Sequence, residues 1–543
     1  MTIQGLFLEM KPYIQPFERL LALQELRALA DSEPIALPKV GQDEATLYEI
    51  ITEVSPEFLA SRLTYWETVR GDGAIAPRFI TQQVRYEAAS DAARNGGWIE
   101  ALPETLPFNG HVPLPRRRTL RYGSHGIHEY RGKFFPQLVR SLLNIAGANE
   151  ETVVLDPMCG SGTTLVEASI LGCTSFGLDM NPLSVLMSQA KTEILAVAPV
   201  VVLNEYKQLE IDVLKVARKG ALLNQLAWLD NLPARDREYL ALWFAPELLT
   251  HLDPIMTRIQ QTDQPACRKL FLIALSNILR GISWQKDDDL RVRKQEKQAS
   301  NFDVTRLFLD ELESSLKSVL SFLFEKNGRT VGKAQVIAGD ACCAAETLPD
   351  QVGSVDVVIT SPPYATALPY LDTDRLSLCY LNLLSRPEHR SRDYHMIGNR
   401  EITERYRQSY LDTYRSEKST LPEDIVTVID RIHTLNENGD VGFRRRNLSA
   451  LLAKYFLDMR RVFENLHTLV RPGSSVYVVI GNNHTIAGGE RVDIETDTLL
   501  AQLGQNVGFA LEEAISMEML VSRDIFKKNA SSAETILNFR HQS

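Results

Sequence analysis

The residues Ser361-Pro362-Pro363-Tyr364 have types and a spacing that could do chemistry. They follow a β-branched segment, 354–359, that is predicted to be a buried strand. Because proline cannot donate to a sheet ladder and restricts the residue before it to extended conformations, the two prolines predict a stiff loop at the strand's carboxyl end. The Ser361 hydroxyl and neighbouring carbonyl groups would then lie beside the Tyr364 ring. Such acceptors suit a planar ring with an exocyclic amine, although a proline-rich turn that only caps a strand is the alternative.

A second segment, Asp156–Thr164 with the sequence DPMCGSGTT, lies between a predicted strand (152–155) and a predicted helix (165–171). A strand, a glycine-rich turn and a helix in this order form a nucleotide-type cradle at the carboxyl end of a strand. The segment is not a dinucleotide fingerprint, because Leu165 occupies the position of the third glycine, and the chain contains no P-loop sequence. An aspartate at the strand end would repel a pyrophosphate, so it favours a ligand that carries an ammonium group.

Two further predicted strands also end in an aspartate. Asp179 ends the strand 174–179, 17 residues past Gly162, where an acidic residue can bind ribose hydroxyl groups. It could instead only anchor the following helix, which Asn181 begins as an N-cap residue. Asp340 ends the strand 334–340 and could accept a hydrogen bond from the amino group of an adenine. Since the carboxyl ends of strands line the ligand crevice of an open α/β sheet, we expect these residues to lie near Ser361.

The elements that must position these residues predict an α/β protein. Beside the strands already named, the pattern predicts a strand at 475–480 and two final strands at 509–519 and 534–539. Amphipathic helices are predicted at 447–469 and 496–506. Together they indicate a Rossmann-like fold with a seven-stranded sheet.

The chain is long enough for several domains, with 543 residues of which 44% are hydrophobic. We predict a helical N-terminal extension (1–110), a first part of the α/β domain (111–195), a helical insertion (196–333) and a second part of the α/β domain (334–543). The last part contains a further insertion or lid at 366–446, because a connection of that length after the reactive loop is too long to be a simple turn. Either insertion, or the extension, could contact the substrate.

Charge and composition exclude several classes of protein. The net charge of −10 argues against a protein that coats nucleic acid, but it leaves open an enzyme with one basic cleft. Short basic clusters occur at 116–121, 291–294 and 444–446. The six cysteines have neither a Cys-x-x-Cys nor a zinc-like spacing, so no metal site or disulfide framework is predicted. No segment has the roughly 18 uncharged apolar residues of a membrane span, and no signal peptide is evident, so we predict a cytoplasmic location.

Together, Asp156–Thr164 and Thr360–Tyr364 resemble the amino-methylating DNA methyltransferases that depend on S-adenosylmethionine. The serine of the second motif is similar to that of the cytosine-N4 subgroup, whereas the adenine-N6 subgroup more often has aspartate or asparagine there. The loop His128-x-Tyr-x-x-Lys-Phe-x-Pro136 resembles the family segment that closes over the methionine end of the cofactor. The resemblance covers about residues 120–195 and 334–540.

The resemblance implies S-adenosylmethionine as the cofactor and double-stranded DNA as the substrate, with a restriction endonuclease or a defence-system subunit as a candidate partner. Asp156, Gly160 and Gly162 would hold the methionine part, Asp179 the ribose and Asp340 the adenine. The implied cofactor-binding residues are Tyr130, Lys133, Phe134, Asp156, Pro157, Cys159, Gly160, Gly162, Thr163, Thr164, Asp179, Met180, Asp340 and Ala341. The implied catalytic residues are Ser361, Pro362, Pro363 and Tyr364.

The implied reaction is a direct attack of an exocyclic amine on the methyl group of a sulfonium. Acceptors at Ser361 and at the Pro362 carbonyl would draw the amine towards tetrahedral geometry and take up its developing positive charge. Alignment of the reactants supplies much of the remaining rate enhancement. The target base must leave the duplex and stack on Tyr364. No Pro-Cys pair is present in the chain, which counts against methylation of cytosine C5.

Three alternatives stay open beside a cytosine-N4 enzyme. One is an adenine-N6 DNA methyltransferase. Another is an RNA methyltransferase acting on guanine N2, which would resemble this chain in both motifs but usually carries an RNA-binding N-terminal domain. The last is a non-catalytic nucleic-acid-binding protein with the same fold, which the two intact motifs disfavour.

Overall fold

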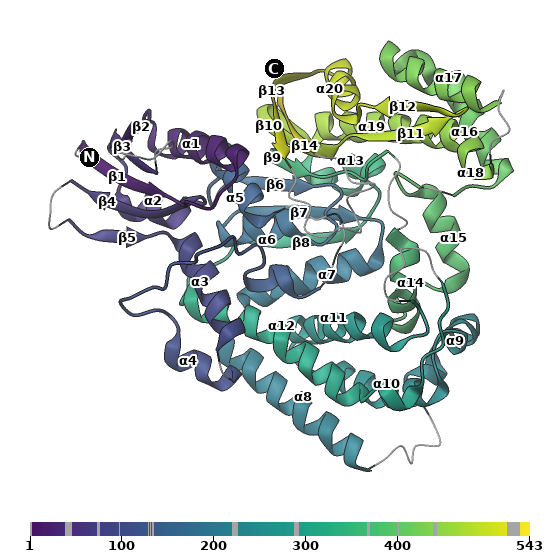
Figure 1. Ribbon diagram of the computed structural model, residues 1–543, viewed down its shortest axis with the longest axis horizontal. Coiled ribbons are helices and arrows are strands. Elements are labelled where there is room, and N and C mark those ends of the chain that lie inside the picture. The colour runs from purple at the N-terminus through teal and green to yellow at the C-terminus, as the bar shows by residue number, and fades with distance from the viewer. Residues whose placement is uncertain are drawn as a thin grey trace.

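The structure of the protein is a computed structural model whose centre is a seven-stranded sheet (Figure 1). It describes residues 3–37, 46–72, 76–96, 98–128, 130, 132, 135–219, 226–286, 293–365, 370–399, 401–437, 442–518 and 533–542. The strand order is β13-β14-β10-β9-β6-β7-β8. The strands are β6 (Val153–Asp156), β7 (Thr174–Asp179), β8 (Ala334–Ala338), β9 (Val355–Thr360), β10 (Val470–Gly481), β13 (Phe509–Glu518) and β14 (Ala533–His541). The five from β6 to β10 are mutually parallel, and β14 is antiparallel to both of its neighbours.

This sheet is the predicted Rossmann-like α/β fold. The helices α6 (Thr163–Ile170) and α7 (Pro182–Glu193) follow β6 and β7. Helix α7 begins as expected, because the Asn181 side chain accepts a hydrogen bond from the backbone of Leu183 and Pro182 occupies the first turn. The predicted helices at the C-terminal end are also present, as α19 (Leu448–Leu469) and α20 (Thr496–Val507).

Successive residues of the central strands pack on opposite faces of the sheet. Val357 and Ile359 of β9 belong to a hydrophobic cluster that includes α5 (Pro136–Ile145). Val358, between them, belongs to a second cluster with α19 and α20. A strand that is buried on both faces needs apolar residues at every position, which explains the continuous β-branched sequence before Ser361.

The N-terminal extension contains an antiparallel sheet in the order β2-β3-β1-β4-β5, which the prediction of a mostly helical segment missed. Its strands are β1 (Gln4–Met10), β2 (Ile35–Leu37), β3 (Leu47–Thr52), β4 (Trp66–Gly71) and β5 (Arg78–Ile80). They are short, and β1 buries every second side chain although its sequence does not alternate apolar and polar residues. The helices here are α1 (Pro16–Ala30), α2 (Pro56–Arg62), α3 (Gln82–Asn95) and the short α4 (Leu102–Thr105). The predicted cap of α2 is confirmed, since Ser55 accepts from the backbone of Phe58.

Buried polar contacts join this extension to the α/β domain. Asn144 of α5 donates to Glu25 of α1 (3.1 Å) and accepts from the Arg62 guanidinium of α2 (3.1 Å). Gln137 of α5 donates to Glu87 of α3 (3.1 Å), which also forms a buried ion pair with Lys11 of the extension (2.9 Å). Because these groups must stay paired when they are buried, the extension has a defined orientation on the α/β domain.

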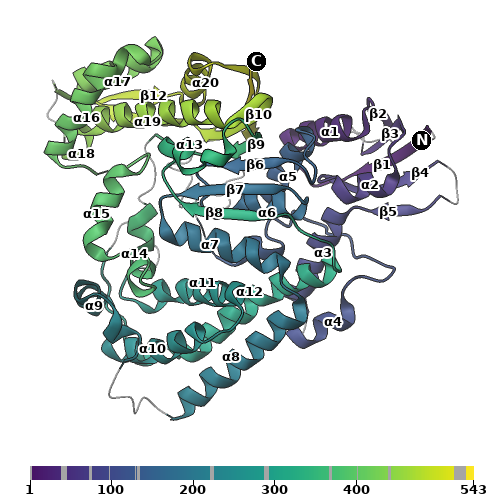
Figure 2. The same ribbon diagram turned by 180° about the vertical axis from the view of Figure 1, so that it is seen from behind.

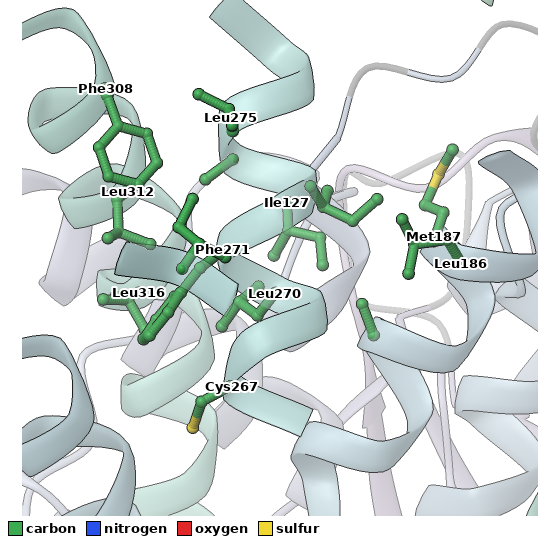
Figure 3. Close-up of a cluster of buried hydrophobic side chains, with 14 of the residues drawn as sticks. Ile127, Leu186, Met187, Cys267, Leu270, Phe271, Leu275, Phe308, Leu312 and Leu316 are labelled. Atoms are coloured by element: carbon green, nitrogen blue, oxygen red, sulfur yellow. The ribbon is translucent and has the colours of Figure 1, made fainter. Parts of the chain in front are cut away.

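The insertion between β7 and β8 is helical, as expected. It contains α8 (Pro199–Lys219), α9 (Ala234–Ala241), α10 (Pro246–Gln260), α11 (Pro265–Ile282) and α12 (Val304–Lys326). Its side chains share one hydrophobic cluster with α7 of the α/β domain. Figure 3 shows Leu270, Phe271 and Leu275 of α11 between α12 and the side chains of Leu186 and Met187. The insertion is therefore part of the main core.

A second group of helices follows β9. It contains α14 (Tyr370–Tyr380), α15 (Arg386–His395), α16 (Glu404–Glu417), α17 (Glu423–Glu437) and α18 (Phe443–Arg446), and the short α13 (Ala344–Thr347) precedes β9. A hairpin of β11 (Asn483–Ala487) and β12 (Glu490–Ile494) follows β10. Within the described ranges, no helix combines the length and apolar character that a membrane span requires.

Glu167 of α6 is the hydrogen-bond acceptor of a fully buried polar network. A substitution of this residue tests how much the network contributes to stability. Glu167 accepts hydrogen bonds from Tyr122 (2.6 Å), His125 (2.7 Å) and Arg140 (2.8 Å). We expect Glu167→Ala to lower the free energy of unfolding by about 3–5 kcal/mol, because it leaves the Arg140 guanidinium buried without a counter-charge. Urea denaturation measures this change.

The matched control is Glu512→Ala, which removes an exposed ion pair with Arg540 (3.0 Å). It should change the free energy of unfolding by less than about 1 kcal/mol. Equal effects of the two substitutions would contradict the assignment of the Glu167 network as a buried structural element.

Candidate active site at the carboxyl ends of the parallel strands

The loops after β6, β7, β8 and β9 meet at a cavity. Most of the residues predicted from the sequence line it, namely Tyr130, Asp156, Pro157, Cys159, Gly160, Thr163, Asp179, Met180, Asp340, Ala341, Ser361 and Pro363. Four others, Gly162, Thr164, Pro362 and Tyr364, lie outside the lining. Lys133 and Phe134 lie outside the described residues. The prediction that the strand ends converge is therefore correct.

The glycine-rich turn after β6 is shaped by two residues in the left-handed region of backbone conformation. Gly160 has φ +48° and Gly162 has φ +76°, which side chains rarely tolerate. A Cβ atom on Gly162 would lie 2.7 Å from Ser188 Oγ of α7, and one on Gly160 would lie 2.9 Å from the Tyr130 hydroxyl oxygen. The turn thus packs tightly between α7 and the loop that contains Tyr130.

Asp156 ends β6 and is 2% exposed. Its Oδ1 atom accepts hydrogen bonds from the Thr360 hydroxyl (2.8 Å) and from the backbone N–H of Met158 (3.2 Å). Burial raises the pKa of this carboxyl to about 7, and the hydrogen bonds offset only part of that effect. Such a carboxyl gains most from a neighbouring positive charge, which would favour its ionised form.

Asp179 ends β7 and is bound by backbone groups on both sides. Oδ1 accepts from Asn181 N (2.8 Å) and Oδ2 accepts from Gly160 N (2.9 Å). It therefore anchors the start of α7, as the structural alternative proposed, and it also holds the glycine-rich turn. Each oxygen keeps a second lone pair, and the residue lines the cavity. Burial raises the pKa of Asp179 to about 6.

Asp340 follows β8 on the same side of the cavity. Its Oδ1 atom accepts from the backbone N–H of Cys342 (2.9 Å) and so caps a short helix. The other oxygen has no part in this cap and is available to a ligand, since the residue lines the cavity beside the buried Ala341.

Some residues of the loop after β9 line the cavity, whereas Tyr364 contacts the neighbouring strands. Ser361 and Pro363 line the cavity, and Pro362 is buried. The Tyr364 hydroxyl donates to Glu534 of β14. Its ring lies against Gly481 of β10, where a Cβ atom would be 2.9 Å from the ring. Gly481 and Glu534 are directly opposite each other in the β10–β14 ladder, so Tyr364 is held by the antiparallel side of the sheet.

Sequence reasoning missed Gly481 and Glu534, and it also missed Met396 and Ile397, which line the cavity from the loop after α15. This loop is fixed by Lys454 of α19, whose ammonium group donates to the carbonyls of His395 (3.3 Å) and Met396 (3.2 Å). The only sequence signal was an apolar pair in a polar segment. Contacts between positions so far apart in the chain leave no local pattern.

The second group of helices also contacts the loop after β7. Asn181 donates to Asp374 of α14 (2.8 Å), and Arg392 of α15 donates to the carbonyl of Met180 (3.2 Å). Together with Met396 and Ile397, these contacts make the segment after the reactive loop one side of the cavity.

The donors and acceptors of the cavity fit S-adenosylmethionine. Two partly or fully buried carboxyls have raised pKa values, which suits a cationic ligand with hydroxyl groups. The glycine-rich turn lines the cavity through Cys159, Gly160 and Ser161. When bound, S-adenosylmethionine supplies a methyl group on a positively charged sulfur.

Comparison with known proteins supports the same assignment. The family model described as "RMKL-like, methyltransferase domain" matches residues 128–215. The chain is 23% identical to the Type II methyltransferase M.BsoBI of Geobacillus stearothermophilus over 446 residues, which are 76% of this chain and 83% of that one. It is 22% identical to the Type II methyltransferase M.MvaI of Kocuria varians, over 70% of this chain and 80% of the relative.

A shorter segment is more similar still. Over 96 residues the chain is 44% identical to the Type II methyltransferase M.MjaII of Methanocaldococcus jannaschii, which is 18% of each chain. The central sheet, the chemistry of the cavity and these relatives agree. The chain is thus similar to Type II methyltransferases over most of its length, and the matched family model supports a methyltransferase domain.

Proposed function

We propose that this protein transfers a methyl group from S-adenosylmethionine to the exocyclic N4 amine of a cytosine in double-stranded DNA. The observation that carries the proposal is the position of Ser361 and Pro363 in the same cavity as Asp156, Asp179 and Asp340. The names of the relatives, which are Type II methyltransferases, support DNA as the substrate and a role in restriction and modification. A cognate restriction endonuclease would be the corresponding partner.

In this proposal the three aspartates divide the cofactor among them. Asp156 pairs with the ammonium group of the methionine part beside Gly160, which lines the cavity, and Gly162 lets the turn pack against Ser188. Asp179 accepts from the ribose hydroxyl groups with its remaining lone pairs. Asp340 accepts from the adenine amino group. Tyr130 packs against Gly160 and covers the methionine end.

The same proposal gives the reactive loop an electrostatic role. The Ser361 hydroxyl and the Pro362 carbonyl accept hydrogen bonds from the target amine and stabilise the positive charge that develops on it. The Thr360 hydroxyl donates to Asp156 (2.8 Å), so the residue before Ser361 is fixed to a carboxylate of the cofactor site. This bond supports the alignment of amine and methyl group that a direct transfer needs.

Tyr364 provides the stacking surface for the extruded base, and Glu534 positions it. The bond from the Tyr364 hydroxyl to Glu534 and the contact of the ring with Gly481 fix the ring at one orientation. A fixed ring lowers the entropy cost of ordering the base on it.

The first test is methyl transfer from labelled S-adenosylmethionine to mixed genomic DNA and to total RNA, with mass analysis of the nucleosides. We expect N4-methylcytosine in DNA. The Ser361→Ala variant should lower kcat about 10²-fold, by analogy with the loss of one preorganised hydrogen-bonding group, with little change in cofactor affinity.

Other outcomes would separate the parts of the proposal. N6-methyladenine would overturn the base assignment while leaving the cofactor site intact. Label in RNA alone would move the protein to the RNA-modifying alternative. Binding of the cofactor without transfer to either nucleic acid would contradict the proposed activity.

The raised pKa of Asp156 predicts a pH dependence of cofactor binding. The neutral carboxyl must lose its proton to pair with a cation, so binding should release a proton and weaken as the pH falls below about 7. We expect affinity for S-adenosylmethionine to be several-fold lower at pH 6 than at pH 7.5, measured by calorimetry in two buffers of different ionisation enthalpy.

The control is Asp156→Asn, which cannot ionise. The affinity of this variant for S-adenosylmethionine should be lower at every pH, and the variant should release fewer protons on binding than the wild type does. If both proteins show the same pH dependence, another group is responsible and the assigned role of Asp156 is wrong.

The link between Tyr364 and Glu534 can be tested with a double-mutant cycle. Glu534→Ala should raise the KM for DNA about tenfold and leave cofactor affinity within twofold, because the tyrosine ring loses its fixed orientation. In the background of Tyr364→Phe, which has no hydroxyl group to position, Glu534→Ala should add little. Independent, multiplicative effects would show that Glu534 does not act through Tyr364.

A further inference from the structure

The short helix α18 exposes an aromatic side chain and three consecutive arginines. Phe443 is 56% exposed and the Arg444 side chain is 66% exposed, and Arg445 and Arg446 are also exposed. Arg444 pairs with Glu401, but neither Arg445 nor Arg446 forms a side-chain ion pair within the described part of the chain. Guanidinium groups suit phosphate oxygens, and exposed aromatic rings suit sugars and bases.

Two sets of hydrogen bonds join α18 to the edge of the sheet where the active site lies. Asn447, which follows α18, donates to the carbonyl of Ile402 (3.0 Å), and Ile402 is five residues past Ile397 in the cavity lining. Asn436 of α17 donates to the carbonyl of Arg445 (2.7 Å) and accepts from the backbone of Gly488 in the β11–β12 hairpin (3.1 Å).

The hairpin itself leaves the sheet at the active site. It begins at Asn483, two residues past Gly481, against which the Tyr364 ring packs. Figures 1 and 2 both show α18 beside α16, and α17 and α18 pack together. The arginines therefore belong to a unit that is attached to the chain near Ile397, which lines the cavity, and near Gly481, which contacts Tyr364.

In the helices of the insertion, the apolar sides and several exposed cations already have partners within the protein. The apolar sides of α11 and α12 are used in the main core (Figure 3). Several of its exposed cations pair with an acid on the same helix, as Lys215 does with Asp212 (3.4 Å) and Arg306 with Asp310 (3.5 Å). Such pairs neutralise the field that a polyanion would meet.

We propose that Phe443, Arg444, Arg445 and Arg446 bind the phosphate backbone of the DNA substrate beside the active site. This inference rests on the proposed function. A protein with a net charge of −10 needs a local cationic surface to hold a polyanion. Contacts of this type set the position of the duplex and carry no sequence information, so the group consisting of α15–α18 and the β11–β12 hairpin positions the DNA, whereas α8–α12 support the core.

The test compares two triple variants of the full chain. The first is Arg444→Gln, Arg445→Gln and Arg446→Gln. The matched control is Lys207→Gln, Lys215→Gln and Arg306→Gln, which removes three exposed cations from the helical insertion. Binding of a fluorescent 30-base-pair duplex (about 100 Å at the usual axial rise) is measured by anisotropy over a range of salt concentrations, together with kcat, KM for DNA and cofactor affinity.

We expect the α18 variant to bind DNA at least tenfold more weakly at moderate salt. The slope of log affinity against log salt should fall by about 2–3, because each lost phosphate contact contributes about 0.9. Cofactor affinity and kcat at saturating DNA should stay within twofold of the wild type. The insertion control should differ from the wild type by less than twofold in every quantity.

Two further variants exclude a folding defect as the cause. The triple Arg→Lys substitution at the same positions keeps the charges and should restore most of the salt slope. Phe443→Ala should weaken binding a few-fold without changing the slope, since it removes no charge.

The outcomes distinguish this inference from the proposed function. Normal methylation of DNA by an α18 variant with unchanged affinity and salt slope would overturn the inference alone. An equal loss of affinity in the insertion control would also overturn it. A wild-type protein that methylates RNA and neither binds nor methylates DNA would instead refute the proposed function on which the inference rests.

Discussion

The hydrogen bond from Thr360 to Asp156 (2.8 Å) joins the two motifs on which the site depends. An isolated buried carboxyl is unfavourable, and this one is stabilised by that hydroxyl group, by one backbone N–H and by the Thr164 side chain. The bond forms because β6 and β9 are parallel neighbours whose register pairs Val154 with Val357 and Leu155 with Val358. Their last residues therefore reach the same level. Any shift of this register would separate the proposed cofactor site from the reactive loop.

The two insertions into the sheet differ in how they meet the cavity. The helices between β7 and β8 are continuous with the core, because residues of α11 and α12 share a cluster with α7. The helices after β9 also pack into the core, through α14 in that cluster and α17 in the cluster of α19, and they add polar contacts at the cavity edge, such as those of Asn181 with Asp374 and of Arg392 with the Met180 carbonyl. Polar contacts at a cavity edge adjust to a ligand more readily than a close-packed core does. A segment that meets a substrate is accordingly expected in the second insertion.

Much of the sheet and of its site could be predicted from the sequence, because the information is local. The strand before Ser361 is mostly β-branched and apolar, and the two glycines of the turn after β6 are two positions apart in the chain. The N-terminal sheet was missed since β1 is short, has no alternation of apolar and polar residues, and is followed by a leucine-rich helix. Glu534 and Ile397 were missed for a different reason, as their roles arise from pairings with Tyr364 and with the cavity that only the folded topology creates. The role of Asp179 could be predicted only in part. Its position at a strand end predicts contact with a ligand, but its two hydrogen bonds from backbone N–H groups are known only from the structure.

The site uses a parallel part and an antiparallel part of the same sheet. The parallel strands β6, β7 and β8 contribute the carboxyls around the cavity, whereas Tyr364 is held by β10 and the antiparallel β14. The loop between them is stiff, because Pro362 and Pro363 remove two backbone donors and fix two φ angles. Stiffness lets a single short segment keep a constant distance between the two parts. In the proposed function, the parallel strands position the cofactor. The orientation of the Tyr364 ring, on which the base stacks, depends instead on Gly481 and Glu534. Substitutions in β14 would therefore change the binding of the base without changing the binding of the cofactor.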